Sequence, residues 1–201
     1  GYQLLYKGVN AQTGVYEVED INRDAVITFP DDYSFGTSTD PDFFGGLQNT
    51  FRFKGIEFSF FLDFRKQLGR NYLGIIGGNH PGLPVNQPVI VLDRWQQPGD
   101  NNSIQKFTSR LGGAAGLGAT YLSRSNGVLS DASFVRLKNL SLSYSLTEKL
   151  SKRIGMKNCS IYVQAQNVAL FTNYKGSDPE TQDFYVLPPL RTIVAGLKLN
   201  F

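Results

Sequence analysis

The stretch 47-LQNTFRFKGIEFSFFLDF-64 alternates between apolar and polar side chains on both sides of Lys54 and Gly55. A period of two is typical of β-strands with one apolar face, and a two-residue turn between two such runs predicts a tight hairpin. Each strand has roughly eight to ten residues, close to the ~9 to 11 of a tilted strand that crosses a bilayer. The hairpin therefore predicts an all-β fold with one apolar face.

The same period returns in three later segments: 137-LKNLSLSYSL-146, 159-CSIYVQAQNVALFTNY-174 and 191-RTIVAGLKLNF-201. In the first, a row of Ser opposes a row of Leu and Tyr, which suits a wall with water on one side and hydrocarbon on the other. In the second, the alternation shifts near Asn167, as at a β-bulge. In the last, we expect Ile193, Leu197, Leu199 and Phe201 to face lipid.

Composition supports a β-rich protein and excludes other classes. The 201 residues include 15 Phe, 10 Tyr and 21 Gly, a mixture that favours strands and turns. No run approaches the ~18 apolar residues of a spanning helix. The net charge of +3 comes from dispersed residues, so no nucleic-acid partner is indicated.

No catalytic constellation is expected, and we predict that the protein is not an enzyme. Cys159 is the single cysteine and His80 the single histidine. A disulfide framework is therefore excluded, and His80 has no Ser or Cys that the sequence can put beside it. The glycine-rich stretches LGGAAGLG and GLGATYL lack the Lys-Ser/Thr of a phosphate-binding loop, so we expect flexible loop there.

Counting strands back from Phe201, at the periplasmic rim, assigns long loops to the outside and shorter turns to the inside, the asymmetry of bacterial barrels. The expected parts are an extracellular hairpin and acidic loop (1–45), a barrel hairpin (46–66), a long extracellular loop (67–132) in which only 89–95 looks ordered, and three final strands (133–201) with a periplasmic turn (147–158) and an extracellular loop (175–190).

Five strands cannot close a membrane barrel, because the smallest such barrels have eight and an open edge in lipid leaves backbone groups unsatisfied. We therefore expect more chain to complete the sheet. The sequence has no initiator Met and no signal segment, so we also expect Gly1 not to be the start of the gene product.

Six stretches, taken in order, resemble the SusC/RagA-type TonB-dependent outer-membrane transporters of Bacteroidota. They cover most of the chain: YKGVNAQTGVYEVEDINRDAVIT, FFGGLQNTFRFKGIEFSFFLDF, VLDRWQQPGD, LSDASFVRLKNLSLSYSL, IYVQAQNVALFTNYKGSDPET and LPPLRTIVAGLKLNF.

The resemblance implies a large, plugged barrel of the 22-stranded type, of which these residues form the last five antiparallel strands with long extracellular loops. It implies import of oligosaccharides or peptides with a SusD-like lipoprotein as a lid. Energy would come from the TonB system through a plug outside these residues. Phe201 resembles the carboxy-terminal signal that the outer-membrane assembly machinery reads. The strand sequences do not distinguish an importer of glycans from an importer of peptides.

The acidic loop offers a candidate Ca²⁺ site. Its ligands would be Asp20, Asn22, Asp24, the carbonyl of Val26 and, at the twelfth position, Asp31. Oxygen ligands at alternate positions are what Ca²⁺ takes in a tight loop. The sixth position, where such a loop requires Gly, holds Ala and departs from the resembled family. A plain solvated acidic loop is the alternative.

Aromatic and charged loop residues are the candidate contacts to a substrate or to the lid. They are Asp93, Arg94, Trp95, Tyr121, Phe184 and Tyr185. Aromatic faces suit stacking on sugar rings, and the charged groups suit hydrogen bonds. Packing within the loops is the competing explanation.

Two alternatives remain open. A soluble β-sandwich that binds carbohydrate would use the same alternation to fill a core between two sheets. A complete small barrel would need further strands within residues 67–132.

Overall fold

The computed structural model describes residues 1–78, 80–153 and 155–200. It divides into two compact units. The sheet unit contains Pro41–Gln67, Ser133–Asn173 and residues 186–200, and the loop unit contains Gly1–Asp40, Leu68–Ala132 and Tyr174–Tyr185. No helix in the described ranges is long and apolar enough to cross a membrane.

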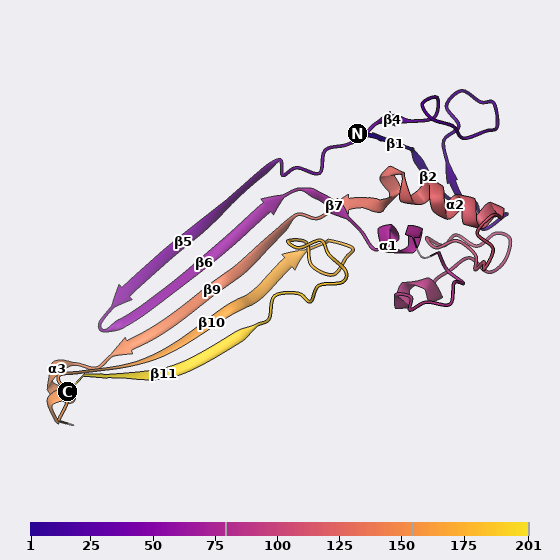
Figure 1. Cartoon of the computed structure of the whole chain (residues 1–201). Coiled ribbons are helices and arrows are strands. Elements are labelled where there is room, and N and C mark those ends of the chain that lie inside the picture. The colour runs from indigo at the N-terminus through magenta and orange to yellow at the C-terminus, as the bar shows by residue number, and fades with distance from the viewer. Residues whose placement is uncertain (79, 154, 201) are drawn as a thin grey trace. The chain divides into compact units, whose positions relative to one another are not determined.

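The sheet unit is built on five antiparallel strands in the order β11-β10-β9-β6-β5 (Figure 1). Their bounds are β5 (Phe43–Phe53), β6 (Ile56–Lys66), β9 (Phe134–Ser145), β10 (Asn158–Thr172) and β11 (Thr192–Asn200). The predicted hairpin is β5–β6. Lys54 and Gly55 at its turn have φ of 47° and 85°, the left-handed pair that a two-residue hairpin turn requires.

The register separates the sheet into an apolar and a polar face. Across the strands, Phe51 lies opposite Phe58, Phe58 opposite Leu142, Leu142 opposite Val163, and Val163 opposite Ala195. A one-residue slip would invert every side chain, so the matching rows fix the register. The polar rows predicted from the sequence share the other face.

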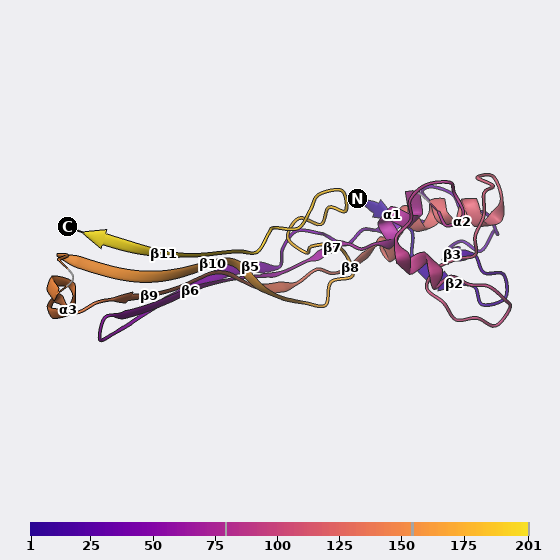
Figure 2. The same cartoon turned by 90° about the horizontal axis from the view of Figure 1, so that it is seen from below.

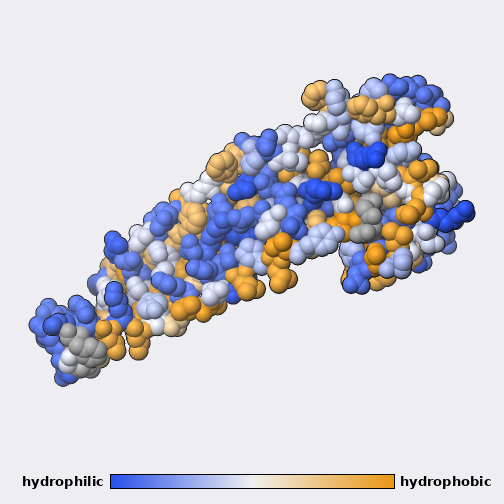
Figure 3. Space-filling model, in the orientation of Figure 1, coloured by the Kyte–Doolittle hydropathy of each residue, from blue (hydrophilic) through white to orange (hydrophobic). Residues whose placement is uncertain are grey.

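The sheet is a single layer (Figure 2). Among the described residues of this unit, the strands contact one another and the short helix α3 (Glu148–Arg153), and no second layer covers either face. A β-sandwich requires two facing sheets, so this unit does not match that alternative. Figure 3 shows hydrophilic side chains gathered over the middle of the sheet on one face.

A β-bulge interrupts the sheet at Lys138, in the amino-terminal half of β9. Lys138 is the extra residue of β9 relative to β6, where Phe61 pairs with Asn139 and Leu62 with Leu137. The predicted irregularity of β10 is present at the same level, and Asn167 there has φ of 51°. Bulges insert unpaired residues and increase local twist. The register of β9 therefore changes at the same level relative to both of its neighbours, β6 and β10.

The described residues of the loop unit form three two-stranded sheets and several short helices. The sheets pair β1 (Tyr2–Gln3) with β4 (Ser34–Phe35), β2 (Tyr6–Val9) with β3 (Tyr16–Val18), and β7 (Leu68–Arg70) with β8 (Leu129–Asp131). The helices are α1 (Leu73–Gly78), α2 (Ala114–Ser123) and the 3-10 turns η1 (Val89–Leu92) and η2 (Asn126–Val128).

A hydrophobic core holds the loop unit together. Tyr16, Leu73, Ile76, Val91, Ile104, Leu122 and Val128 form it. The buried Gln105 crosses this core, because its Nε2 donates to Ala115 O at 2.8 Å and its Oε1 accepts from Tyr16 N at 3.3 Å. Its amide thus satisfies backbone groups of α2 and β3 away from water.

The prediction of flexible loop for LGGAAGLG and GLGATYL is wrong, because residues 114–123 form α2. The expectation that only 89–95 is ordered within 67–132 is wrong as well. The glycines mark close packing: a Cβ on Gly118 would lie 2.8 Å from Val15 Cγ1 and 3.0 Å from Tyr16 O. Glycine therefore lets α2 approach β3.

Candidate functional site

The apolar face of the sheet carries large side chains that are unusually exposed. Examples are Phe51, exposed by 54%, Leu197 by 63% and Ile193 by 67%. Soluble monomers rarely expose contiguous apolar patches beyond a few hundred Å². A row of such residues on every strand suits contact with hydrocarbon.

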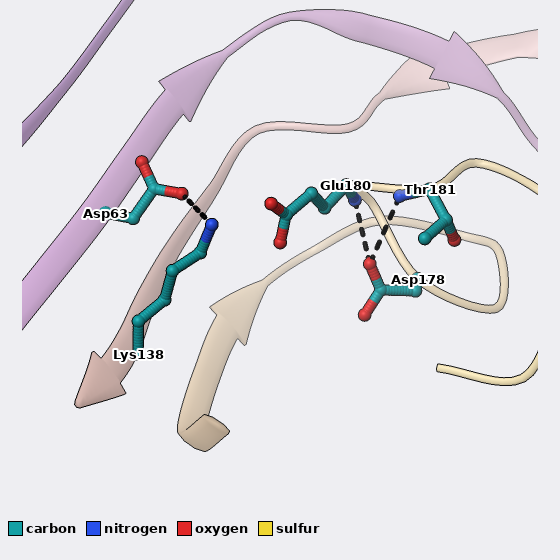
Figure 4. A network of polar contacts seen from close by, with 5 residues as sticks. All are labelled: Asp63, Lys138, Asp178, Glu180 and Thr181. Carbon is teal, nitrogen blue, oxygen red and sulfur yellow. Dashed lines mark hydrogen bonds and ion pairs between the residues drawn. The ribbon is translucent and has the colours of Figure 1, made fainter. Parts of the chain in front are cut away.

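The polar face carries ion pairs between neighbouring strands. Arg52 Nε lies 2.6 Å from Glu57 Oε2 across the hairpin, and Lys138 Nζ lies 2.8 Å from Asp63 Oδ2 beside the bulge (Figure 4). The Arg52–Glu57 pair is exposed to solvent, and pairs of this kind contribute about 0–1 kcal/mol. The Lys138–Asp63 pair is more shielded.

The acidic loop is closed by hydrogen bonds from its own backbone. Asp20 accepts from Arg23 N (2.7 Å) and Ala25 N (2.8 Å), and Asp24 Oδ1 accepts from Val26 N (2.8 Å). Ala25 has φ of 66°, so the sharp turn forms without glycine.

The five candidate ligands are only partly brought together. Asn22 Nδ2 donates to Asp24 Oδ2 at 3.0 Å, whereas Asp31 is exposed to solvent. In the described part of the chain, no group of three or more His, Cys, Asp or Glu side chains is arranged to hold a metal ion. Calcium binding stays a prediction.

Asp32, which the sequence did not single out, is the buried carboxylate of this loop. Its oxygens accept from Ile21 N and Thr28 N, both at 2.8 Å. Hydrogen bonds from the Thr28 and Ile21 amides lower the pKa of Asp32 below its ordinary value, against the opposing effect of desolvation. Asp32 therefore closes the loop as a carboxylate.

Trp95 and Arg94 are engaged within the loop unit. Trp95 Nε1 donates to Ala11 O at 2.9 Å, and the indole covers Gly14, where a Cβ would lie 2.3 Å from the ring. The Arg94 guanidinium lies 3.9 Å from the centroid of the Phe107 ring. These contacts support the packing explanation for both residues, while Asp93 is exposed.

Phe184 and Tyr185 line a pocket of ≈ 520 Å³. Its other lining residues are Arg70, Gly74, Ile75, Thr181, Gln182 and Asp183. A second pocket of ≈ 510 Å³ shares Ile75 and Phe184. Among the described residues, Asp93, Arg94, Trp95 and Tyr121 line neither pocket.

A tight turn presents the pocket residues 181–185. Asp178 is buried, and its Oδ1 accepts from Glu180 N at 2.9 Å and Thr181 N at 3.3 Å (Figure 4). Gln182 N donates to Asp178 O at 2.8 Å, and Gln182 has φ of 51°. No motif marks Arg70 or Gln182 in the sequence; only the adjacent Phe and Tyr gave a signal.

The single histidine and the single cysteine, to which the sequence analysis assigned no function, are inaccessible to solvent. His80 and Cys159 are both buried, so neither presents a reactive group to solvent. Phe201, the predicted assembly signal, lies outside the described residues.

Comparison with known proteins gives one consistent answer. The sequence is 26% identical to the TonB-dependent receptor P3 of Formosa agariphila, matching 100% of this chain and 21% of that protein. It is 29% identical to the TonB-dependent receptor P39 of the same organism, over 80% of this chain and 16% of that protein. No protein-family model matches.

The fold is that of part of the RagAB peptide transporter. All of this chain superposes on 22% of a chain of that structure with a TM-score of 0.73 and 24% identity. The chain spans about a fifth of the length of the curated relatives that it matches.

Proposed function

We propose that this chain forms the carboxy-terminal wall and loops of an outer-membrane importer, because its sequence is similar to TonB-dependent receptors and its fold to part of the RagAB transporter. The sheet unit is the last five strands of a 22-stranded type of barrel. The rest of the barrel and a plug complete the protein. The loop unit is extracellular, and the carboxy terminus lies at the periplasmic rim.

The single-layer sheet with one exposed apolar face carries this proposal. A membrane-spanning strand needs side chains that alternate between lipid and a hydrated lumen. Val163 and its neighbour Gln164 meet this requirement. Val163 lies in the apolar row between Leu142 and Ala195. Gln164 lies opposite Ser141 on the polar face, where the row reaches Val194 on β11.

The proposed partners of the full-length protein follow from its assignment as an outer-membrane importer. The importer takes up oligosaccharides or peptides, with a SusD-like lipoprotein as its lid. The TonB system supplies energy through the plug, and the assembly machinery inserts the barrel. The structural similarity to the RagAB peptide importer supports an importer built from two proteins.

Arginine substitutions on the two faces test the membrane assignment. In the full-length protein, Val163→Arg is expected to reduce the folded population in the outer membrane, because arginine on a lipid face costs about 2–4 kcal/mol near the bilayer midplane. Gln164→Arg, one residue away on the polar face, is the matched control and is expected to assemble normally.

The readout is the amount of heat-modifiable, folded protein in purified outer membranes. Equal amounts of the two variants would contradict the proposal. Recovery of the wild-type protein in the soluble fraction without detergent would contradict it too.

A further inference from the structure

Two adjoining pockets of the loop unit differ in chemistry but share a wall. Ile75 and Phe184 line both pockets. The first pocket is polar on its remaining sides, and the second is lined mainly by apolar and aromatic residues. A ligand that fills both must therefore present a polar group next to an apolar one.

Arg70 is the cation of the first pocket. Its guanidinium lies beside Gly74, where a Cβ would be 3.3 Å from Nε and 3.5 Å from Nη2. Among the described residues, no carboxylate forms an ion pair with Arg70. Asp183 lines the same pocket, but its Oδ1 accepts from Tyr185 N at 2.7 Å and so orders the exposed aromatic segment. The guanidinium remains available for an anion, which arginine binds in bidentate fashion.

The second pocket suits a large apolar side chain. In addition to the shared residues, its walls are Tyr72, Pro88, Ile90 and Tyr174, together with Lys175, Gly176 and Ser177. The Tyr174 hydroxyl donates to Arg70 O, and Tyr72 N donates to Lys175 O at 3.0 Å. These polar groups are thus engaged in holding the two pockets together.

We infer that the two pockets bind a peptide segment, with a carboxylate at Arg70 and a neighbouring large apolar side chain between Tyr72, Ile90 and Phe184. This inference rests on the proposed importer function and selects its substrate class. A sugar would place hydroxyls against the Pro88 and Ile90 side chains, which offer them no hydrogen-bond partner. A hydrophobic side chain gains by the same burial.

Three acetylated and amidated peptides test the inference on the full-length protein in detergent. The probe is Gly-Phe-Asp-Gly, and Gly-Phe-Asn-Gly and Gly-Ala-Asp-Gly each remove one of the two features. We expect both controls to bind roughly tenfold more weakly than the probe by calorimetry, since each loses one favourable contact.

Variants then assign the contacts. Arg70→Gln is expected to weaken the Asp probe about tenfold and to leave the Asn peptide unchanged. Phe184→Ala is expected to weaken the Phe peptides and spare the Ala peptide. Arg110→Gln is the matched control, because Arg110 is an exposed arginine of the same unit that lines neither pocket.

Failure of this inference is distinguishable from failure of the importer proposal. Probe binding that is absent, or equal in the wild-type protein and in Arg70→Gln, overturns the peptide site, as does displacement of the probe by a neutral oligosaccharide. The importer proposal instead depends on the membrane levels of Val163→Arg and Gln164→Arg, which these pocket variants do not affect.

Discussion

At the residue scale, Asp32 makes the acidic loop sensitive to pH. Its folded pKa is lowered by the Thr28 and Ile21 amides, whereas an unfolded Asp titrates near 3.9. The resulting stabilisation is fully present above the unfolded pKa and is lost as pH falls through the lower folded value. We expect hydrogen exchange of residues 21–28 to accelerate as the pH is lowered below about 4, after correction for intrinsic rates.

Asp32→Asn removes this pH dependence and loosens the loop even at neutral pH, since an amide has one acceptor oxygen where the carboxylate has two. Asp31→Asn is the matched control because Asp31 is the exposed neighbour. Both are measured in a chelator. Equal exchange in both variants would show that the buried carboxylate does not close the loop.

Calcium binding is a separate prediction for the same loop. Asp20, Asn22 and Asp24 supply oxygens within one turn, and extracellular calcium modules bind with Kd of roughly 0.1–1 mM. We expect calcium in this range to slow proteolysis of the loop and Asp24→Asn to abolish the effect. Protection by magnesium to the same degree, or none by calcium, would reject the site.

At the element scale, α2 depends on glycine for its contact with β3. A valine at Gly118 would meet Val15 and the backbone oxygen of Tyr16, and overpacking of this kind costs about 1–3 kcal/mol. Gly118→Val is therefore expected to lower the opening free energy of α2 in hydrogen exchange by about 1–3 kcal/mol. Gly112→Val is the control, because a Cβ on Gly112 meets nothing within 4 Å. Equal effects would contradict the close approach.

The sheet strands were predictable because each keeps a period of two against one apolar face. Phe58, Leu142 and Leu197 all belong to runs whose alternation is visible in the sequence. Helix α2 was not predictable on the same basis, since its Ala and Gly residues show no amphipathic stripe and glycine disfavours helix. Its order comes from tertiary packing, which a local pattern does not encode.

The candidate site was predictable only in part. Phe184 and Tyr185 stood out as loop aromatics, and both line a pocket. Arg70 and Gln182 are more than a hundred positions apart, and only the fold brings them together. Trp95 was equally conspicuous in the sequence, yet its ring covers a hairpin turn. Residue type alone therefore does not separate binding from packing.

At the scale of the whole molecule, we predict that membrane assembly depends on the last strand. Leu197 and Leu199 continue the apolar face of β10, and Phe201 ends the same alternation in the sequence. Phe201→Ala is expected to reduce assembly of the full-length protein, as judged by folded protein in outer membranes. Peptide binding by the fraction that does assemble should be unchanged. Normal membrane levels of this variant would reject the assembly signal.

The bulge at Lys138 determines where β9 can lose a residue and still keep its register with β6. Deletion of a residue elsewhere in the strand would turn every side chain beyond it to the wrong face. Deletion of Lys138 would leave Leu137, Asn139 and Leu140 in regular alternation, with Leu137 still matched to Leu62. The pairing of β9 with β6 therefore tolerates the loss of one residue at this position without turning the rest of the strand to the other face, whereas β10 would have to accommodate Asn167 and Val168 with no residue of β9 opposite them.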